Sequence, residues 1–432
     1  MRTSIRVGAV IAAAALALTT AACSSGGSND SGPVKLTYWA WAPNMDKVAA
    51  IWNKSNKDIQ VVVNKQDGGD AAVTKLLTAV KAGSGAPDIM QAEYQKIPTL
   101  VSADALVDLK DQGAADLKSE FTSGTWNAVT LGGDSVYAVP QDSGPMMFYY
   151  RKDIFQELGL TAPKTWDEYA TDARTIAQKK PGSFLGTFSS GDPGWFAGLA
   201  QQAGASWWGI DGKAWTVDIS SAATKKVADY WGGLVKEGAI DNKPMYTPAW
   251  NTALNNGTQV GWVSSVWGPG VLAGNAADTQ GKWAAAELPN WDGSKPSNGN
   301  WGGSSTAVTA QSKHPKQAME FIKWLNTDPK AVKALAQIAN IYPADVNASK
   351  VALDTPPAFF ADQTDFYDVA AKASKSVSNF TYGPNVNVAY SAYTDAFAKA
   401  AESKDPAQFE AALTTMQDTT KNDLVKAGFT VK

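Results

Sequence analysis

Aromatic residues stand beside glycine, proline and acidic residues at several places along the sequence. The chain contains 17 Trp, 13 Tyr and 14 Phe. A flat aromatic ring packs against an apolar C–H face, and carboxylate or amide groups exchange hydrogen bonds with hydroxyl groups. Together these groups are suited to hold a carbohydrate. The tryptophans that could stack on such a ligand are Trp39, Trp41, Trp195, Trp267 and Trp301.

Core packing is the alternative for every tryptophan, since this residue type is highly buried on average. We favour ligand contact for Trp195, Trp267 and Trp301, because glycines or prolines surround them in stretches that we interpret as loops. Of the neighbours Trp207 and Trp208, at most one should face a ligand. The tryptophans of helical segments, which we expect in the core, are Trp52, Trp166, Trp231 and Trp324.

Polar candidates accompany these aromatic residues. Asp142 lies in the run Pro-Gln-Asp-Ser-Gly-Pro, where the alternative role is an Asx turn that satisfies local backbone groups. Asp192 precedes Trp195 by three positions, and Asn385 follows Tyr382 at the same spacing. The remaining polar candidates are Gln66, Asp67 and Glu93.

Catalytic and metal-binding patterns are missing from the sequence. It has one histidine, His314, between Lys313 and Pro315, and a solvated helix start explains that residue. There is no G-x-S-x-G, no H-E-x-x-H, no phosphate-binding G-x-x-x-x-G-K and no Cys/His cluster with metal spacing. We therefore expect no catalytic residue, metal or cofactor.

The charge balance argues against nucleic acid as a partner. The chain has 38 Lys and Arg against 41 Asp and Glu, for a net charge of −3. No run of basic residues offers the phosphate affinity on which nucleic-acid binding depends. With 432 residues the chain exceeds what one hydrophobic core usually carries, so two domains are expected.

The candidate residues follow predicted strands. Apolar alternation predicts strands at 34–41, 59–63 and 87–91, and helical spacing predicts helices between them, with Met45, Val48, Ala49 and Trp52 on one face. This order predicts a parallel sheet with right-handed crossovers. Ligands of such sheets bind beyond the carboxyl ends of the strands. Those ends carry Trp39 and Trp41, then Gln66 and Asp67, then Glu93 and Tyr94.

Later segments keep this α/β character. Thr165 and Glu168 fit a capping box that opens a helix to about Lys179. A further helix is predicted from Ala318, Phe321, Ile322 and Leu325. Glycine- and proline-rich stretches near 141–145, 191–194, 268–270 and 298–303 are candidate binding loops.

The amino terminus predicts secretion. Arg2 and Arg6 precede an apolar run of about a dozen residues, shorter than the roughly 20 that span a membrane. The residues Thr-Thr-Ala-Ala before Cys23 resemble the lipobox of bacterial lipoproteins, although Thr20 stands where leucine is usual. A plain secreted protein is the alternative. Since Cys23 is the only cysteine, no internal disulfide is possible, and 23–33 is expected to be a flexible tether.

Several short motifs recur along the chain in a characteristic order, at 36–41, 74–79, 85–89, 137–145, 148–155, 163–169, 267–269, 301–303 and 312–325. Their order and spacing resemble the bacterial extracellular solute-binding proteins of sugar ABC importers, the maltose-binding-protein-like family. The resemblance covers nearly all of the mature chain.

This resemblance implies a type II binding-protein fold, in which two α/β lobes, each a mostly parallel sheet flanked by helices, enclose a ligand cleft. The chain would cross between lobes near 144–149, 301–304 and 341–344. Glu93 matches a family position for an acid or amide that contacts ligand, and Tyr382 matches one for a further aromatic residue. The implied parts are a signal peptide at 1–22, a tether at 23–33, an N-terminal lobe at 34–145 and 303–342, and a C-terminal lobe at 146–302 and 343–432.

The expected function is capture of a di- to tetrasaccharide, for example a β-linked sugar such as cellobiose, for delivery to a membrane-embedded ABC permease. We expect a lipid-anchored monomer on the outer face of the cytoplasmic membrane. An extracellular glycoside hydrolase would also combine aromatic residues with paired carboxylates. A cell-surface adhesin, or a binding protein for another solute such as a polyamine, iron or thiamine, is a further alternative.

Overall fold

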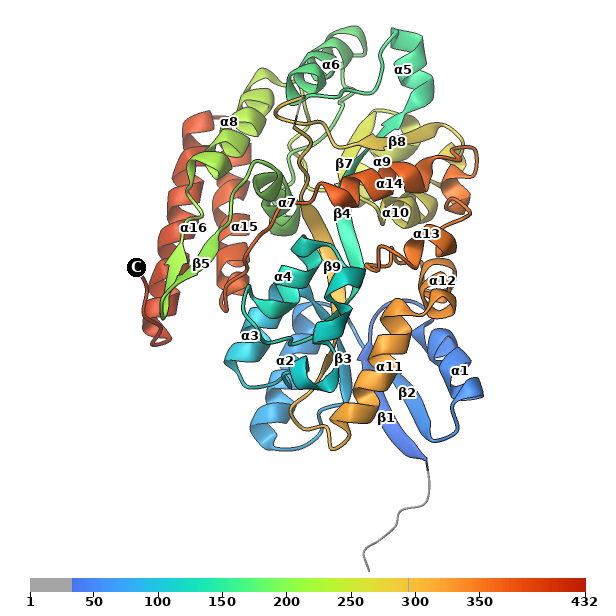
Figure 1. Ribbon diagram of the computed structural model, residues 1–432. Helices are drawn as coiled ribbons and strands as arrows, with labels where there is room; N and C mark the ends of the chain where they lie inside the picture. Colours follow the sequence, from blue (N-terminus) through green and yellow to red (C-terminus); the bar gives the residue numbers. More distant parts are fainter. Residues whose placement is uncertain (1–32, 294) are drawn as a thin grey trace, which may run out of the picture.

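The protein is an elongated molecule of two bodies (Figure 1), seen in a computed structural model that describes residues 33–293 and 295–432. The predicted signal peptide and Cys23 lie outside the described residues. One hydrophobic cluster is drawn from 36–139 and 307–344, and a larger one from 146–301 and 342–424. We call the bodies around these clusters the N-terminal lobe and the C-terminal lobe.

Among the described residues, seven strands form the main sheet, in the order β2-β1-β3-β9-β4-β7, with β8 also paired to β4. A separate two-stranded sheet joins β5 and β6. The strands are β1 (Val34–Ala40), β2 (Ile59–Lys65), β3 (Ile89–Glu93), β4 (Val139–Arg151), β5 (Trp208–Asp211), β6 (Ala214–Val217), β7 (Gly261–Ser265), β8 (Trp283–Glu287) and β9 (Asn300–Val308).

The first three strands are parallel, as predicted. Val34 pairs with Ile59 and Tyr38 pairs with Ile89 in parallel register. β9 then pairs antiparallel with both β3 and β4. The expectation of a mostly parallel sheet holds for this beginning of the chain. In the C-terminal lobe β4 instead pairs antiparallel with β7 and β8, and parallel pairing among the described residues is limited there to isolated bridges such as Phe184 with Gln259.

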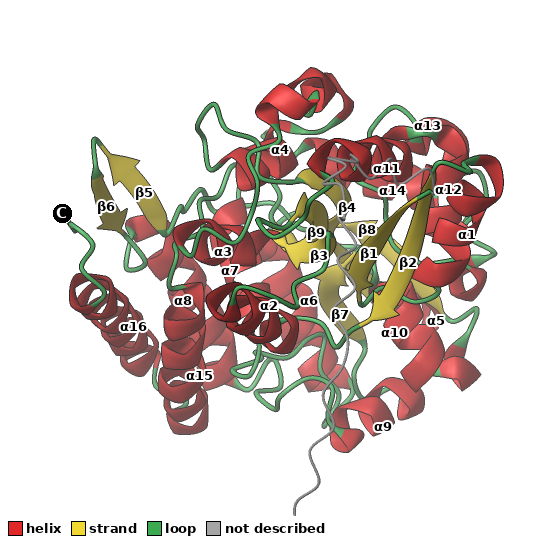
Figure 2. Cartoon of the chain, turned by 90° about the horizontal axis from the view of Figure 1, so that it is seen from below, coloured by secondary structure: helices red, strands yellow, loops and turns green. Residues whose placement is uncertain are grey.

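Helices cover both faces of the N-terminal sheet (Figure 2). α1 (Met45–Ser55) buries Met45, Val48, Ala49 and Trp52, the face predicted from spacing. Trp52 meets Phe321 of α11 (Pro315–Thr327) edge to face, with ring centroids 5.6 Å apart. α2 (Asp70–Ala82) lies on the opposite face of β1.

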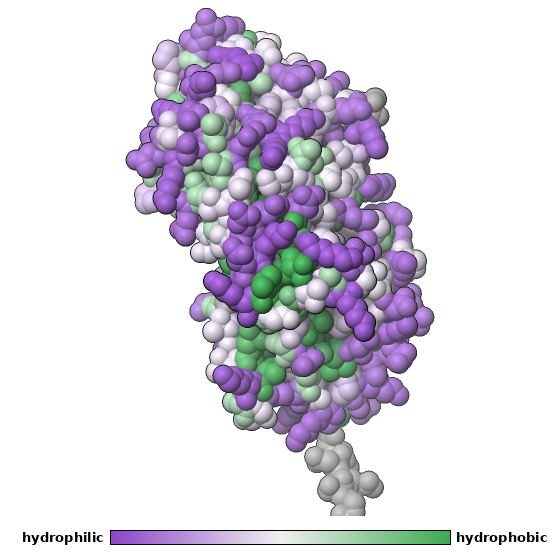
Figure 3. Space-filling view, turned by 90° about the vertical axis from the view of Figure 1, so that its left-hand side faces the viewer, coloured by the Kyte–Doolittle hydropathy of each residue, from purple (hydrophilic) through white to green (hydrophobic). Residues whose placement is uncertain are grey.

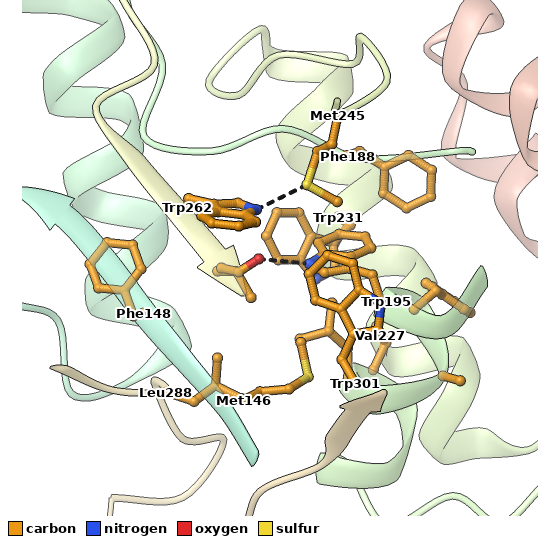
Figure 4. Packing of buried hydrophobic residues seen from close by; sticks show 14 of the residues in the cluster. Met146, Phe148, Phe188, Trp195, Val227, Trp231, Met245, Trp262, Leu288 and Trp301 are labelled. Atoms are coloured by element: carbon orange, nitrogen blue, oxygen red, sulfur yellow. Dashed lines mark hydrogen bonds between the residues drawn. The ribbon is translucent and has the colours of Figure 1, made fainter. Parts of the chain in front are cut away.

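Aromatic side chains fill the core of the C-terminal lobe (Figure 4). α6 (Trp166–Lys179) begins at the predicted cap, because Thr165 Oγ1 accepts a hydrogen bond of 3.2 Å from the Glu168 N–H. Trp166 of this helix meets Trp231 of α8 (Ala222–Glu237) edge to face. Both rings are almost fully buried, as expected of helix tryptophans.

The remaining helices complete the two lobes. None of the helices among residues 33–293 and 295–432 is long and apolar enough to span a membrane. The other α-helices are α3 (Ile97–Ser102), α4 (Ser123–Thr130), α5 (Lys152–Leu158), α7 (Pro193–Gln202), α9 (Pro248–Asn256), α10 (Gly268–Asn275), α12 (Pro329–Gln337), α13 (Ser349–Ala352), α14 (Phe366–Lys375), α15 (Val386–Ser403) and α16 (Pro406–Lys426). Short 3-10 turns are η1 (Tyr94–Lys96), η2 (Lys110–Gln112), η3 (Ala115–Glu120), η4 (Ala277–Thr279) and η5 (Ala358–Phe360).

Two strands and one further segment connect the lobes. β4 and β9 each contribute to both, and they approach closely at glycine: a Cβ on Gly144 would lie 2.3 Å from the Trp301 carbonyl oxygen. The third connection runs beside β4, where Ser143 N–H donates to the Tyr342 carbonyl at 2.9 Å and Ala344 N–H donates to the Gln141 carbonyl at 3.1 Å. Backbone hydrogen bonds therefore hold β4, β9 and the third segment side by side.

Candidate ligand-binding site

The carboxyl ends of β1, β2 and β3 bring predicted residues of the N-terminal lobe together. A Cβ on Gly68 would lie 3.2 Å from Trp41 Cγ, and one on Gly69 would lie 3.8 Å from Glu93 Oε2. The loop after β2 therefore lies against both residues. Trp41 and Glu93 are each half-buried, so part of each side chain remains exposed at this edge of the sheet.

A buried amide fixes the ends of these strands. Gln91 Oε1 accepts hydrogen bonds from the backbone N–H groups of Trp41 and Ala42, each at 3.1 Å. Gln91 Nε2 donates to Ser304 Oγ at 2.9 Å, and Ser304 in turn donates to Asp142 Oδ1. The chain of bonds joins the end of β1 to β3, β9 and β4, and it links the backbone at Trp41 to the side chain of Asp142.

Asp142 lies at the junction of the two lobes. Burial raises the pKa of its carboxyl from 3.8 to about 6, although the hydrogen bond from Ser304 acts in the opposite direction. Its backbone carbonyl accepts a hydrogen bond of 2.8 Å from the Tyr94 hydroxyl. The carboxyl group therefore bonds a side chain on β9. This long-range partner differs from the local Asx turn that we gave as the alternative role.

The C-terminal lobe contributes a second group of aromatic and acidic residues. Trp267 Nε1 donates to the Trp301 carbonyl at 2.8 Å, and the two rings meet edge to face at 4.7 Å. Asp192 caps α7, accepting a hydrogen bond of 3.1 Å from the Trp195 N–H. Burial raises the pKa of Asp192 to about 6, opposed by hydrogen bonds that include one from the Trp301 side chain. Trp301 itself is largely enclosed, with 7% of its surface exposed.

Two tyrosines, Tyr382 and Tyr390, lie near carboxylates of both lobes. Tyr382 packs against both hydrophobic clusters, and its hydroxyl shares a hydrogen bond with that of Tyr390 on α15. Burial raises the pKa of both hydroxyls, and the charge of Glu93 raises them further; Asp192 also acts on Tyr390. Carboxylates from both lobes therefore lie within electrostatic reach of one tyrosine pair.

Sequence reasoning missed Tyr246, which adjoins this group. The residue is 44% exposed, and its ring lies 6.4 Å from the Trp301 ring. Burial of the hydroxyl raises its pKa, and the charge of Asp192 raises this pKa further. Its backbone is left-handed, with φ of 63°. The flanking prolines at 244 and 248 mark a turn and were the available signal. For Tyr390, within a helix, the sequence offers none.

Trp195 does not lie where the sequence suggested. It is 1% exposed, and its Nε1 donates to the Val263 carbonyl at 3.2 Å inside the aromatic core (Figure 4). The neighbouring Pro193 and Gly194 form the first turn of α7, where proline is favoured. These residues therefore begin a helix whose tryptophan faces the core, and the stacking role expected for Trp195 is wrong.

Trp39 and Asn385 are engaged by side chains or backbone of neighbouring elements. Trp39 is 7% exposed, and the Lys75 ammonium lies 4.3 Å from its ring centroid, so a cation already covers the ring. Asn385 Nδ2 donates to the Thr420 carbonyl and to Asp423 Oδ2, at 2.9 and 3.0 Å. These bonds hold α15 against α16 and engage the Asn385 amide nitrogen, and the ligand role expected for this residue stays a prediction.

Gln66 and Asp67 occupy the loop beside Trp41. Gln66 Oε1 accepts a hydrogen bond of 2.7 Å from Lys75 Nζ, and Asp67 is exposed. Both Trp207 and Trp208 are buried, so neither faces a ligand. No group of three or more His, Cys, Asp and Glu is placed to hold a metal ion in the part of the chain that the structure describes.

A sequence profile of the family described as "Bacterial extracellular solute-binding protein" matches residues 36–332. The chain is 23% identical over 354 residues to an arabinooligosaccharide-binding protein of Halalkalibacterium halodurans, covering 79% of this chain and 77% of that protein. It is 28% identical over 343 residues to a lactose-binding protein of Rhizobium radiobacter, covering 73% and 74%.

A solved structure agrees with this assignment over nearly the whole chain. The galacto-N-biose-/lacto-N-biose I-binding protein of a Bifidobacterium longum ABC transporter, in complex with lacto-N-biose, has a TM-score of 0.80 and 29% identity, covering 94% of this chain and 100% of that one. With the sugar-binding protein MalE of Xanthomonas citri the TM-score is 0.76 at 20% identity, over 91% and 98%. The fold is therefore the two-lobe type II binding-protein fold, and the chain belongs to the bacterial extracellular solute-binding proteins, family 1, of sugar ABC importers.

Proposed function

We propose that this protein captures a β-linked oligosaccharide of two to four sugar units between its lobes and delivers it to an ABC import permease. The observation that carries the proposal is that each lobe places aromatic rings near a carboxylate: Trp41 and Glu93 beside one loop of the N-terminal lobe, and Trp301, which contacts Trp267, bonded to Asp192 in the C-terminal lobe. The relatives support the class of ligand, since the names of those compared above contain arabinooligosaccharide, lactose and lacto-N-biose.

The chemistry of these groups suits a sugar. The half-buried rings of Trp41 and Trp267 and the exposed ring of Tyr246 offer faces for apolar C–H surfaces. The carboxylates of Glu93, Asp142 and Asp192 accept hydrogen bonds from hydroxyl groups, and a bond to a charged acceptor is stronger than one between neutral groups. The aromatic rings would bind the flat apolar faces of the sugar units, and the carboxylates would select sugars by the positions of their hydroxyl groups.

Delivery would depend on lobe closure. A ligand that contacts both lobes does so fully only when they are closed, and it shifts the equilibrium by its difference in affinity between the open and closed states. The three connections between the lobes, through β4, β9 and the segment at 342–344, would supply the hinge. The permease would then recognise the closed form.

We further propose that residues 1–22 are a signal peptide and that Cys23 carries a lipid anchor on the outer face of the cytoplasmic membrane. The described residues then form a soluble monomer on the tether. Expression in an actinobacterial or other Gram-positive host, with and without Cys23→Ser, tests the anchor. The Cys23→Ser chain should appear in the medium, whereas the unchanged chain should stay with the membrane fraction; release of both would leave a plain secreted protein.

The first experiment is calorimetry of the soluble form, starting after Cys23, against β-1,6-galactobiose, lactose, cellobiose and arabino-oligosaccharides, with maltose as the α-linked comparison. A saturable heat with a β-linked sugar supports the proposal. The sugars are recovered and analysed: cleaved product would replace the transport role with a glycoside hydrolase. No heat with any carbohydrate would redirect the search to amines, metals and peptides.

Matched variants locate the site. Trp41→Ala and Glu93→Gln should each weaken binding at least about tenfold, since loss of a central contact costs more than roughly 1.4 kcal/mol. Trp215→Ala is the control, because Trp215 is also half-buried but lies on β6, beside the carboxyl-terminal Val431. Equal loss in all three variants would mean a general loss of stability rather than a site at Trp41 and Glu93.

A further inference from the structure

A cavity of about 200 Å³ lies beside the third connection between the lobes. Its lining comes from residues 342–346, from the loop and helix around α13 and from one face of α14. Figure 1 places α13 and α14 to the right of β4, whereas α7 and α15 lie to its left. None of the residues that we assign to the sugar site lines this cavity.

A buried carboxylate forms the floor of the cavity. Asp345 is 1% exposed. Its Oδ1 accepts hydrogen bonds from the N–H groups of Asn347 and Ala348, at 2.8 and 2.6 Å, but its Oδ2 has no hydrogen-bond partner among the residues that the structure describes. A buried acceptor without a donor is costly and rare in native proteins. Asp345 lines the cavity, and its Oδ2 is enclosed, so a small rotation of the side chain would bring this oxygen to an O–H or N–H donor bound there.

The walls and the rim of the cavity indicate what kind of molecule would carry that donor. Tyr342 and Tyr367 stack on one wall, with ring planes 22° apart, and offer an apolar surface. At the rim, exposed Lys350 and Lys375 stand with exposed Asp368. Together with buried Asp345 the lining has two basic and two acidic side chains, which favours neither a cation nor an anion. The volume corresponds to about seven waters at roughly 30 Å³ each. A neutral compact molecule with several hydroxyl groups fits all three features.

We propose that this cavity is a second ligand site, which binds a small polyol through Asp345. The cavity also touches both lobes. α14 belongs to the C-terminal cluster through Phe366 and Ala370, whereas the floor is tied to the N-terminal lobe, since Val346 N–H donates to the Glu120 carbonyl at 2.8 Å. A molecule in the cavity therefore contacts parts that belong to different lobes.

The wall of the cavity is also bonded directly to the sugar site. Pro343 pairs with Asp142, and the hydrogen bonds of Tyr342 and Ala344 bracket that residue on β4. If the lobes move, as the proposed sugar-binding function requires, the polyol and the sugar will change each other's affinity. Because such coupling is reciprocal, both affinities change by the same factor, at least about fivefold. This second part rests on the proposed function; binding of the polyol itself does not.

Saturation-transfer NMR of the intact chain with glycerol and xylitol tests the site. We expect transfer to both polyols in the unchanged chain, loss in Ala371→Trp, which fills the cavity from α14, and retention in Trp41→Ala, which alters only the sugar site. Asp345→Asn keeps the Oδ1 acceptor but places a donor amide at the free position, so it should weaken transfer at least tenfold. Equal thermal unfolding of the variants checks that they fold.

Two results would overturn the proposal: no transfer to either polyol at 0.1 M (about the concentration at which weak millimolar ligands saturate), or transfer that persists unchanged in both cavity variants. The coupling is measured separately, as the affinity for whichever β-linked sugar binds, with and without xylitol. Unchanged sugar affinity would refute the coupling while leaving the polyol site. Absence of any sugar binding would refute the proposed function alone.

Discussion

Tyr246 combines an exposed ring with a backbone conformation that non-glycine residues rarely adopt. The residue before it is anchored, because Trp262 Nε1 lies 3.1 Å from the sulfur of buried Met245 (Figure 4). The left-handed turn at Tyr246 then brings its ring near Trp301. Residues held in such conformations cluster at functional sites, which supports a ligand role for this ring.

Tyr246→Gly is expected to unfold at higher denaturant than Tyr246→Ala, because glycine adopts the left-handed conformation without the roughly 1 kcal/mol that alanine loses. Both variants should bind sugar at least fivefold more weakly than the unchanged chain. Urea titration and calorimetry measure the two effects. Full sugar affinity in both variants would remove Tyr246 from the site.

Asp192→Asn is expected to raise the free energy of unfolding at pH 7.5 by roughly 1–2 kcal/mol. Burial raises the folded-state pKa of Asp192 from 3.8 to about 6, so its contribution to stability is full below pH 4 and is lost as pH rises through 6. Asparagine keeps the cap on α7 and has no charge to bury. Urea titrations between pH 4 and 7.5 should show a smaller decline for the variant.

Exposed Asp116 provides the control for this titration, since Asp116→Asn should change stability by less than about 0.5 kcal/mol at any of these pH values. An identical pH profile for Asp192→Asn and the unchanged chain would show that Asp192 is not the group that titrates.

At the scale of elements, glycine contacts determine how closely the strands and helices pack. A Cβ on Gly299 would lie 1.9 Å from the Gly198 carbonyl oxygen, and one on Gly198 would lie 2.9 Å from that of Asn300. α7 therefore lies directly against the start of β9. Asp192 at one end of α7 and Trp301 on β9 depend on this approach for their positions.

Gly299→Ala should lower the free energy of unfolding by about 2–3 kcal/mol, because the added methyl group forces α7 away from β9. It should also weaken sugar binding by displacing Asp192 from Trp301. Gly233→Ala is the matched control: it lies within α8 with nothing near its Cβ, so it should stabilise by about 0.5–1 kcal/mol. Equal stability of the two variants would contradict the packing argument.

The sequence predicted those elements whose signals are local. The apolar alternation of the first three strands, the Thr165 cap and the buried face of α1 depend only on neighbouring residues, and each prediction is confirmed. The same holds for Ala318, Phe321, Ile322 and Leu325 on α11. The resemblance to the binding-protein family is confirmed by the profile match as well.

Long-range contacts account for what the sequence could not predict. Trp195 and Trp267 stand in similar glycine- and proline-rich runs, yet Trp195 lies inside α7 and Trp267 caps α10. Proline in a first helical turn resembles proline in a loop when only the sequence is known. Likewise, the cover of Trp39 by Lys75 and the bonds of Asn385 to α16 come from residues distant in sequence.

At the scale of the whole molecule, a few direct bonds join the lobes away from β4 and β9. Thr99 Oγ1 on α3 donates to the Pro384 carbonyl at 2.7 Å, and Lys96 Nζ donates to Asn387 Oδ1. Residues around α4 and 379–382 also line a small shared cavity of about 60 Å³. On the face seen in Figure 3, apolar residues gather on the lower body, while charged and polar residues cover most of the upper one.

Thr99→Val is expected to lower sugar affinity about two- to tenfold, because the bond to Pro384 stabilises only a state in which the lobes are this close. Small-angle X-ray scattering should show a larger radius of gyration for the sugar-free variant than for the unchanged chain. Thr78→Val is the control, because Thr78 is exposed on α2 and its hydroxyl donates only within that helix. Equal affinity of both variants would mean that the α3 contact does not contribute to closure.

The position of β9 between β3 and β4 has a consequence for how the chain folds as it is made. The strand that completes the sheet of the first lobe ends at residue 308, after the segments of the second lobe that precede it. During synthesis the N-terminal lobe therefore receives its last strand only after most of the C-terminal lobe has been made. Strand pairings over such a sequence distance are slow to form. A chain stopped near residue 145 would hold β1, β2 and β3 with β3 as an unpaired edge. Such a fragment should aggregate or be degraded instead of folding as half a protein.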